Sequence, residues 1–153
     1  MANYWLMKSE PDVYSLDQLR QDVTTWWTGV RNYQARNFMM KEMQVGDWVL
    51  FYHSNAEPPG VAGLARVTQA AQPDPTQFEK SSEYHDSKAS REKPIWFCVQ
   101  VGYHQTFKKF VSLSDLRAEA RLQEMLVLQK GSRLSVQPVS QKHFEIVKKM
   151  GGL

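Results

Sequence analysis

Short apolar runs, separated by polar and turn-forming segments, recur along most of the chain. Dense or alternating apolar runs are typical of β-strands, because successive side chains of a strand point to opposite faces of the sheet. Such runs predict strands at Tyr4–Met7, Trp48–His53, Val61–Ala71, Ile95–Val101, Thr106–Val111 and Arg133–Val139. In the fourth of these, the alternation predicts one buried face made of Ile95, Phe97, Val99 and Val101, opposite Trp96, Cys98 and Gln100.

Apolar residues at helical spacing, preceded by capping residues, indicate four short helices. Ser15 and Gln18 match a capping box, in which the two side chains satisfy backbone N–H groups at a helix start. The helices are predicted to begin after Ser15, at Tyr33 (ending near Met43), at Leu113 and after Ser140.

Two segments match neither the strand periodicity nor the helix periodicity. Thr24–Asn32 holds two adjacent tryptophans that no single buried face can take, and we expect a loop there. Gln72–Pro94 is polar and rich in turn residues, which predicts a long irregular connection. Roughly six strands with four short helices, mostly joined as hairpins, predict one α+β domain over residues 1–153, with a curved or barrel-like antiparallel sheet.

The composition adds a hint about ligands. Hydrophobic residues make up 42% of the chain, and five Trp, six Tyr and seven Phe exceed what a core of this size needs, so some are expected to line a site. The net charge of +3 and a pI near 9.0 favour phosphate partners weakly. The single cysteine, Cys98, fits a reducing compartment. With no leader and no membrane span in the sequence, we expect a cytoplasmic monomer, or a nuclear one in a eukaryote.

Several kinds of chemistry find no support. Neither glycine-rich phosphate motif is present, so we predict no nucleotide cofactor. The four histidines lack the spacing that places two imidazoles on one metal, so we predict no metal site. Carboxylates are plentiful, and an acid/base pair that meets only in the fold stays open.

A long run, Trp27–Asn37, closely resembles the signature of the EVE domain family. Other segments that match the family lie at Tyr4–Pro11, Gly46–Asp47, Leu50–Asn55, Gly60–Gly63 and Arg133–Val139. The resemblance spans nearly the whole chain. It implies a PUA-like fold, a small curved β-barrel with flanking helices, and a link to recognition of modified bases in DNA or RNA.

The resemblance directs attention to an aromatic pocket. By similarity to the related YTH domains, Lys8–Ser9 and Trp27–Thr28 would border it. Trp26 and Trp27 are candidates to stack on a flipped base, and Phe51 is a candidate to close the cage. The alternative for each of these three residues is packing in the core.

Polar residues of the same motifs are candidates to read or hold the base. Asn32 and Gln34 carry the amide groups needed for a Watson–Crick edge, or else they fix the loop. Tyr33 lies on the predicted second helix beside them. Candidates at strand ends, where turn capping is the alternative, are Ser9, His53, Ser54 and Ser135. Candidates for phosphate contacts, with solvated surface charge as the alternative, are Lys8, Arg31, Arg36 and Arg133.

Three functions follow as hypotheses. The first is a non-catalytic reader that takes a modified cytosine or adenine of DNA or RNA into the aromatic pocket. The second is an enzyme acting on a modified nucleoside, by analogy with the PUA-like ASCH branch, with His53 beside a carboxylate; the ASCH-type sequence pattern is absent. The third is a module that binds a peptide side chain or methylated amine, for which an acidic residue such as Glu10 would face the cage.

Overall fold

The computed structural model, which describes residues 2–131 and 133–153, is built around one six-stranded mixed sheet. The strand order is β2-β5-β4-β3-β1-β6; β1 and β3 are parallel, and the other neighbours are antiparallel. The strands are β1 (Tyr4–Ser9), β2 (Thr24–Trp26), β3 (Trp48–His53), β4 (Gly60–Pro73), β5 (Phe97–Ser112) and β6 (Val136–Val139). The α-helices are α1 (Leu16–Asp22), α2 (Tyr33–Asn37), α3 (Leu113–Ala118) and α4 (Gln141–Met150). The α+β class is therefore confirmed.

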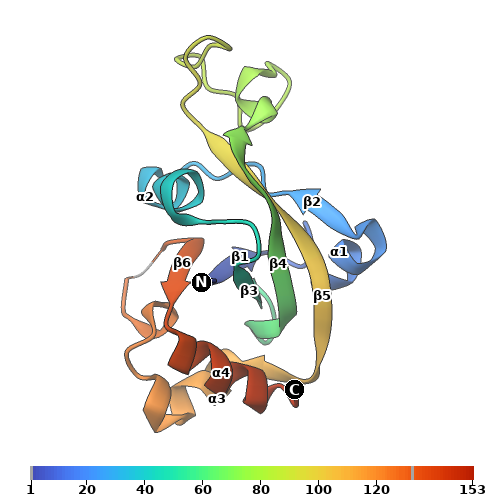
Figure 1. Cartoon of the computed structure of the whole chain (residues 1–153), viewed down its shortest axis with the longest axis vertical. Helices are drawn as coiled ribbons and strands as arrows, with labels where there is room; N and C mark the ends of the chain where they lie inside the picture. Colours follow the sequence, from blue (N-terminus) through green and yellow to red (C-terminus); the bar gives the residue numbers. More distant parts are fainter. Residues whose placement is uncertain (1, 132) are drawn as a thin grey trace.

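The sheet stays open rather than closing into a barrel. Among the described residues, β2 and β6 form its two edges. Strands β4 and β5 run along the long axis of the molecule and carry the segment of residues 74–96 at one end, while α3 and α4 lie at the other (Figure 1). This irregular segment was predicted, and it contains one 3-10 turn, at Pro75–Phe78.

Both faces of the sheet are buried, and each has its own hydrophobic cluster. Alternate residues of β1 divide between them: Trp5 and Met7 pack with α1 and α2, whereas Leu6 packs with α3 and α4. The two helix pairs therefore cover opposite faces, as the period of two along a strand requires. No helix among the described residues is long and apolar enough to cross a membrane.

The segment that was expected to be a loop contains a short strand. Thr24, Thr25 and Trp26 form β2 and pair antiparallel with β5, Trp26 lying opposite Gln100. The pattern gave no sign of it because all three residues are only half-buried, so no apolar alternation marks the strand.

The two strands predicted over residues 95–111 are one strand, β5, which begins at Phe97. Register shifts against β4 let the pairing continue through its polar middle. The predicted buried face is wrong at its start: Trp96 and Cys98 are buried, whereas Phe97 is half-exposed. Cys98 is a free, buried thiol, and burial raises its pKa to about 12, so it is protonated at neutral pH.

Local helix signals were mostly confirmed. Ser15 accepts the Gln18 backbone N–H as predicted, but the Gln18 side chain bonds Asp22 instead of completing the box. The second helix is α-helical only to Asn37 and continues as a π-helix over Phe38–Glu42. The last predicted strand is shorter than expected and begins at Val136.

A buried carboxylate fixes the entry to β3. Asp47 is 1% exposed and accepts three N–H groups: the backbone N–H of Asn3, the backbone N–H of Gln44 and the indole Nε1–H of Trp5, each at 2.9 Å. One side chain thus holds the start of β1 beside the start of β3.

Replacing this carboxylate is expected to destabilise the whole domain. Asp47→Ala leaves three donors without their acceptor, so the free energy of unfolding should fall by roughly 3 kcal/mol in urea denaturation. The exposed Asp17→Ala variant is the control and should change it by less than about 0.5 kcal/mol. Equal effects of the two substitutions would contradict this role for Asp47.

His53 fixes the start of α1. Its Nε2 accepts the backbone N–H of Leu16 at 3.2 Å, which requires a neutral imidazole. Burial lowers the pKa of His53, and the negative charge of Asp17 partly opposes this shift. A folded-state pKa below that of the unfolded chain means that neutral His53 stabilises the fold fully above about pH 6.5.

This contribution should be lost as the pH falls below 6.5 and through the lowered pKa of the folded protein. We expect the urea midpoint of the wild type to drop more steeply between pH 7 and 5 than that of His53→Gln, which keeps an acceptor that does not titrate. Parallel pH profiles of the two proteins would rule out this linkage.

Candidate nucleic-acid interface

A pocket of about 700 Å³ opens where β1 ends. Segments far apart in the sequence line it: the end of β1, the β2–α2 loop, the residue after β3, part of the segment of residues 79–94, and the approach to β6. We call it the Trp26 pocket. The predicted site residues that line it are Lys8, Ser9, Trp26, Trp27, Arg31, Ser54, Arg133 and Ser135.

Backbone pairing brings the three serines of this group together. The Ser54 N–H donates to the Ser9 carbonyl at 3.0 Å, and the Lys8 N–H donates to the Ser135 carbonyl at 2.8 Å. The Ser9 hydroxyl donates to the Tyr14 carbonyl at 2.6 Å, which is the turn-fixing role given as its alternative. The parallel register of β1 and β3 thus sets the positions of these groups at the pocket.

The two tryptophans differ in exposure. Trp27 is 8% exposed, since its ring packs edge-on against the buried Phe51 ring with centroids 5.5 Å apart. Phe51 does not line the pocket, but its ring packs against Trp27, which does. Trp26 is half-buried, which leaves more of its ring surface open to a ligand.

The predicted residues of α2 lie outside the pocket. Asn32 caps α2, its Oδ1 accepting the Ala35 N–H at 3.0 Å, which is the loop-fixing alternative. Tyr33 is 59% exposed and stacks on Trp96 with centroids 4.8 Å apart. Gln34 is exposed, and the Arg36 guanidinium donates to the Ile95 carbonyl.

His53 also lies outside the Trp26 pocket. It borders a second hollow of about 660 Å³ beside Phe110 and Pro58, and its ring nitrogen is used by Leu16. The carboxylate whose charge acts on it most is Asp17, on α1. Among the described residues, no group of three or more His, Cys, Asp or Glu side chains could hold a metal ion.

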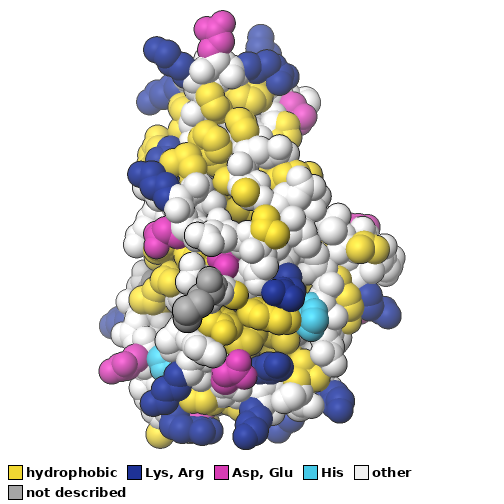
Figure 2. Space-filling model, viewed as in Figure 1, with side chains coloured by type: hydrophobic (Ala, Val, Ile, Leu, Met, Phe, Trp, Pro, Cys, Tyr) yellow, Lys and Arg dark blue, Asp and Glu magenta, His cyan; other side chains and the backbone are white. Residues whose placement is uncertain are grey.

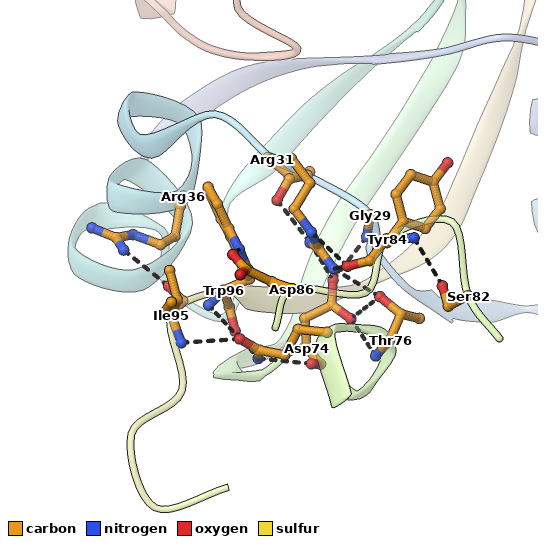
Figure 3. Close-up of polar contacts among 12 residues, drawn as sticks. Gly29, Arg31, Arg36, Asp74, Thr76, Ser82, Tyr84, Asp86, Ile95 and Trp96 are labelled. Carbon is orange, nitrogen blue, oxygen red and sulfur yellow. Dashed lines mark hydrogen bonds and ion pairs between the residues drawn. The ribbon is translucent and has the colours of Figure 1, made fainter. Parts of the chain in front are cut away.

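A buried carboxylate, Asp74, ties the tryptophan loop to the segment that follows β4 (Figure 3). It accepts the Gly29 N–H at 2.8 Å, the Arg31 guanidinium at 3.1 Å and the Thr76 N–H at 2.8 Å. Burial alone would raise the pKa of Asp74, but the hydrogen bonds from Thr76, Gly29 and Arg31 outweigh it and lower the pKa. The carboxylate is therefore ionised, and both of its oxygens accept hydrogen bonds.

Tyr84 is a pocket residue that the sequence did not reveal. It is the one Phe, Trp or Tyr in the polar run 79–94, which was the available signal. Burial, and after it the negative charge of Glu83, raises the pKa of its hydroxyl. Gly29, with φ +86°, passes so close that an added Cβ would lie 2.9 Å from the Tyr84 ring.

Charges of both signs meet at the pocket. Glu10 and Glu83 line it together with Lys8 and Arg133, and burial lowers the pKa of Lys8. On the face drawn in Figure 2, Lys and Arg side chains gather mainly at the two ends of the long axis, over the segment of residues 75–95 and over α3 and α4. The pocket is thus electrostatically mixed rather than uniformly basic.

Comparisons with known proteins find solved structures that share this fold. A protein from Pseudomonas putida has a solved structure with 48% identity and a TM-score of 0.93, covering 97% of this chain and 99% of that one. Human THYN1 protein, solved in complex with DNA containing 5-methylcytosine, has 37% identity and a TM-score of 0.92, covering 99% of both chains. An ASCH protein from Zymomonas mobilis, at 8% identity and a TM-score of 0.55, shares the fold alone.

Proteins with similar sequences indicate the family of this chain. Thymocyte nuclear protein 1 of Homo sapiens is 37% identical over 165 residues, which cover 96% of this chain and 73% of the relative. The family model of the EVE domain matches residues 3–150. The family model and the relatives together show that the chain belongs to the EVE domain family, in agreement with its PUA-like fold.

Proposed function

We propose that this EVE domain binds nucleic acid and accommodates a modified base, of the cytosine or adenine type, in the Trp26 pocket. The observation that carries the proposal is the pocket itself, a hollow of about 700 Å³ lined by Trp26 and Tyr84. Planar aromatic faces in a pocket are what hold a base turned out of its stack. The complex of human THYN1 with DNA containing 5-methylcytosine supports the choice of ligand.

We further propose that binding occurs without catalysis. The enzymatic hypothesis placed the chemistry on His53, but His53 borders another hollow and its Nε2 accepts the Leu16 N–H. An imidazole engaged in this way is not free to exchange protons with a ligand in the Trp26 pocket. Recognition by stacking and hydrogen bonding then accounts for the site. We also propose that the protein acts as a monomer on DNA or RNA, in the cytoplasm or, in a eukaryote, in the nucleus.

One observation favours a second candidate. Glu10 and Glu83 line the Trp26 pocket beside the aromatic rings, and carboxylates near an aromatic cage suit a methylated amine of a peptide. The two candidates differ in ligand charge, because a nucleic acid brings phosphates to the pocket and a methylated lysine brings a cation.

Removing Trp26 should weaken nucleic-acid binding. Stacking of one base on one aromatic ring contributes about 1–3 kcal/mol, so Trp26→Ala should raise the Kd for an oligonucleotide with 5-methylcytosine roughly 5- to 150-fold in calorimetric titration. Tyr33→Ala removes an exposed aromatic ring outside the pocket and serves as the matched control. Equal losses in both variants would argue against the pocket, and saturable binding of a trimethyl-lysine peptide alone would favour the second candidate.

Phosphate contacts should appear in the salt dependence. Lys8→Gln or Arg133→Gln is expected to reduce the slope of log K against log salt concentration by about 1, because each phosphate contact releases close to one counterion. Lys149→Gln, near the end of α4 and away from the pocket, should leave the slope unchanged. An affinity that does not depend on salt in the wild type would refute phosphate contact altogether.

A further inference from the structure

Arg31 has no guanidinium N–H left for a phosphate. Its Nε and Nη2 donate to the Tyr84 carbonyl at 3.0 and 2.7 Å, and Nη2 also donates to the Thr76 hydroxyl at 3.0 Å. Its Nη1 donates to the Val30 carbonyl at 3.0 Å and to Asp74 at 3.1 Å. A guanidinium carries five N–H groups, and five acceptor contacts use them all.

These contacts converge on one residue of the pocket. The Tyr84 carbonyl receives two of the five bonds, and the Arg31 guanidinium lies 5.5 Å from the centroid of the Tyr84 ring (Figure 3). The ring also packs against Gly29, whose N–H donates to Asp74. Tyr84 is therefore fixed through both its backbone and its ring.

Such fixation matters because of where Tyr84 lies. It belongs to the irregular segment of residues 79–94, which has no strand or helix to hold it in place. A wall that is already ordered before a ligand arrives avoids the entropic cost of ordering it on binding. The side chain half-buried at the pocket is an aromatic ring, which can contact the face or edge of a base.

We infer that Tyr84 is an aromatic wall of the pocket that contacts the bound base, and that Arg31 is a positioning residue that acts through Tyr84. This inference rests on the proposed function. It replaces the predicted role of Arg31 as a phosphate ligand, since its donors already serve Tyr84, Asp74, Thr76 and Val30. Arg31 then contributes to recognition without touching the ligand.

A double-mutant cycle tests both parts of the inference. The proteins are the wild type, Tyr84→Ala, Arg31→Gln and the double variant, titrated with oligonucleotides containing cytosine or 5-methylcytosine at several salt concentrations. Loss of one stacking wall should raise the Kd roughly 5- to 150-fold in Tyr84→Ala. If Arg31 acts only through Tyr84, adding Arg31→Gln to Tyr84→Ala should cause no further loss, and the salt slope should stay at the wild-type value.

Further variants separate the contributions. Tyr84→Phe keeps the ring and should stay within about threefold of the wild type if the ring makes the contact. Arg20→Gln, an exposed arginine of α1 outside the pocket, is the arginine control and should leave both the Kd and the salt slope unchanged. Thermal denaturation reports whether Arg31→Gln is folded; should it unfold, Tyr84→Ala against Tyr84→Phe still decides whether the ring contacts the base.

Three outcomes would overturn the inference. Wild-type affinity in Tyr84→Ala would remove Tyr84 from the ligand contact while leaving the proposed function standing. Additive losses with a salt slope reduced by about 1 in Arg31→Gln would make Arg31 a phosphate ligand instead. Absence of binding by the wild-type protein to every oligonucleotide would overturn the proposed function and this inference together.

Discussion

The ionised carboxylate of Asp74 joins two segments that the sheet alone would leave independent. One is the tryptophan loop between β2 and α2, and the other is the irregular segment after β4. A carboxylate buried without partners is costly, so the hydrogen bonds that Asp74 accepts from Gly29, Thr76 and Arg31 must form together. The shape of the Trp26 pocket depends on this one shared anion.

The pocket combines features that a simple electrostatic account of nucleic-acid binding would not produce. Carboxylates of Glu10 and Glu83 stand beside aromatic rings and near Lys8. Such a mixture provides little general attraction for a polyanion, and it suits a ligand chosen by shape and hydrogen bonding once it has arrived. For the proposed nucleic-acid ligand, the basic side chains at the two ends of the long axis are candidates to supply attraction over longer range (Figure 2).

Local structure that depends on residues close in the sequence, such as a helix cap, could be predicted from the sequence. Structure that depends on contacts between residues far apart in the sequence, such as the pairing of a short strand, could not. Ser15 and Ser140 were recognised as helix caps because their partners lie three residues away. The strand at Thr24–Trp26 was missed because its ladder is supplied by β5, more than 70 residues further along the chain. The sequence alone suggested a phosphate contact for Arg31, and it could not reveal the acceptors of its guanidinium, most of which lie beyond position 70.

The site shows the same division. The family resemblance placed Ser9 and Ser54 in one site, and they meet through the parallel pairing of β1 with β3, which the antiparallel sheet expected from the sequence did not include. Tyr84 carries no periodicity and sits in a polar stretch, so nothing local distinguishes it from a solvated residue. Its place in the pocket follows from contacts with the main chain of Gly29 and the side chain of Arg31.

The close passage of Gly29 beside the Tyr84 ring has an evolutionary consequence. A side chain at position 29 meets two obstacles, the left-handed backbone at φ +86° and the aromatic ring 2.9 Å from its Cβ. A smaller residue at position 84 would remove the second obstacle but not the first. The two positions are therefore coupled in one direction: the aromatic ring can be replaced while the glycine stays, whereas a side chain at position 29 requires the Tyr84 ring to shift or to be replaced.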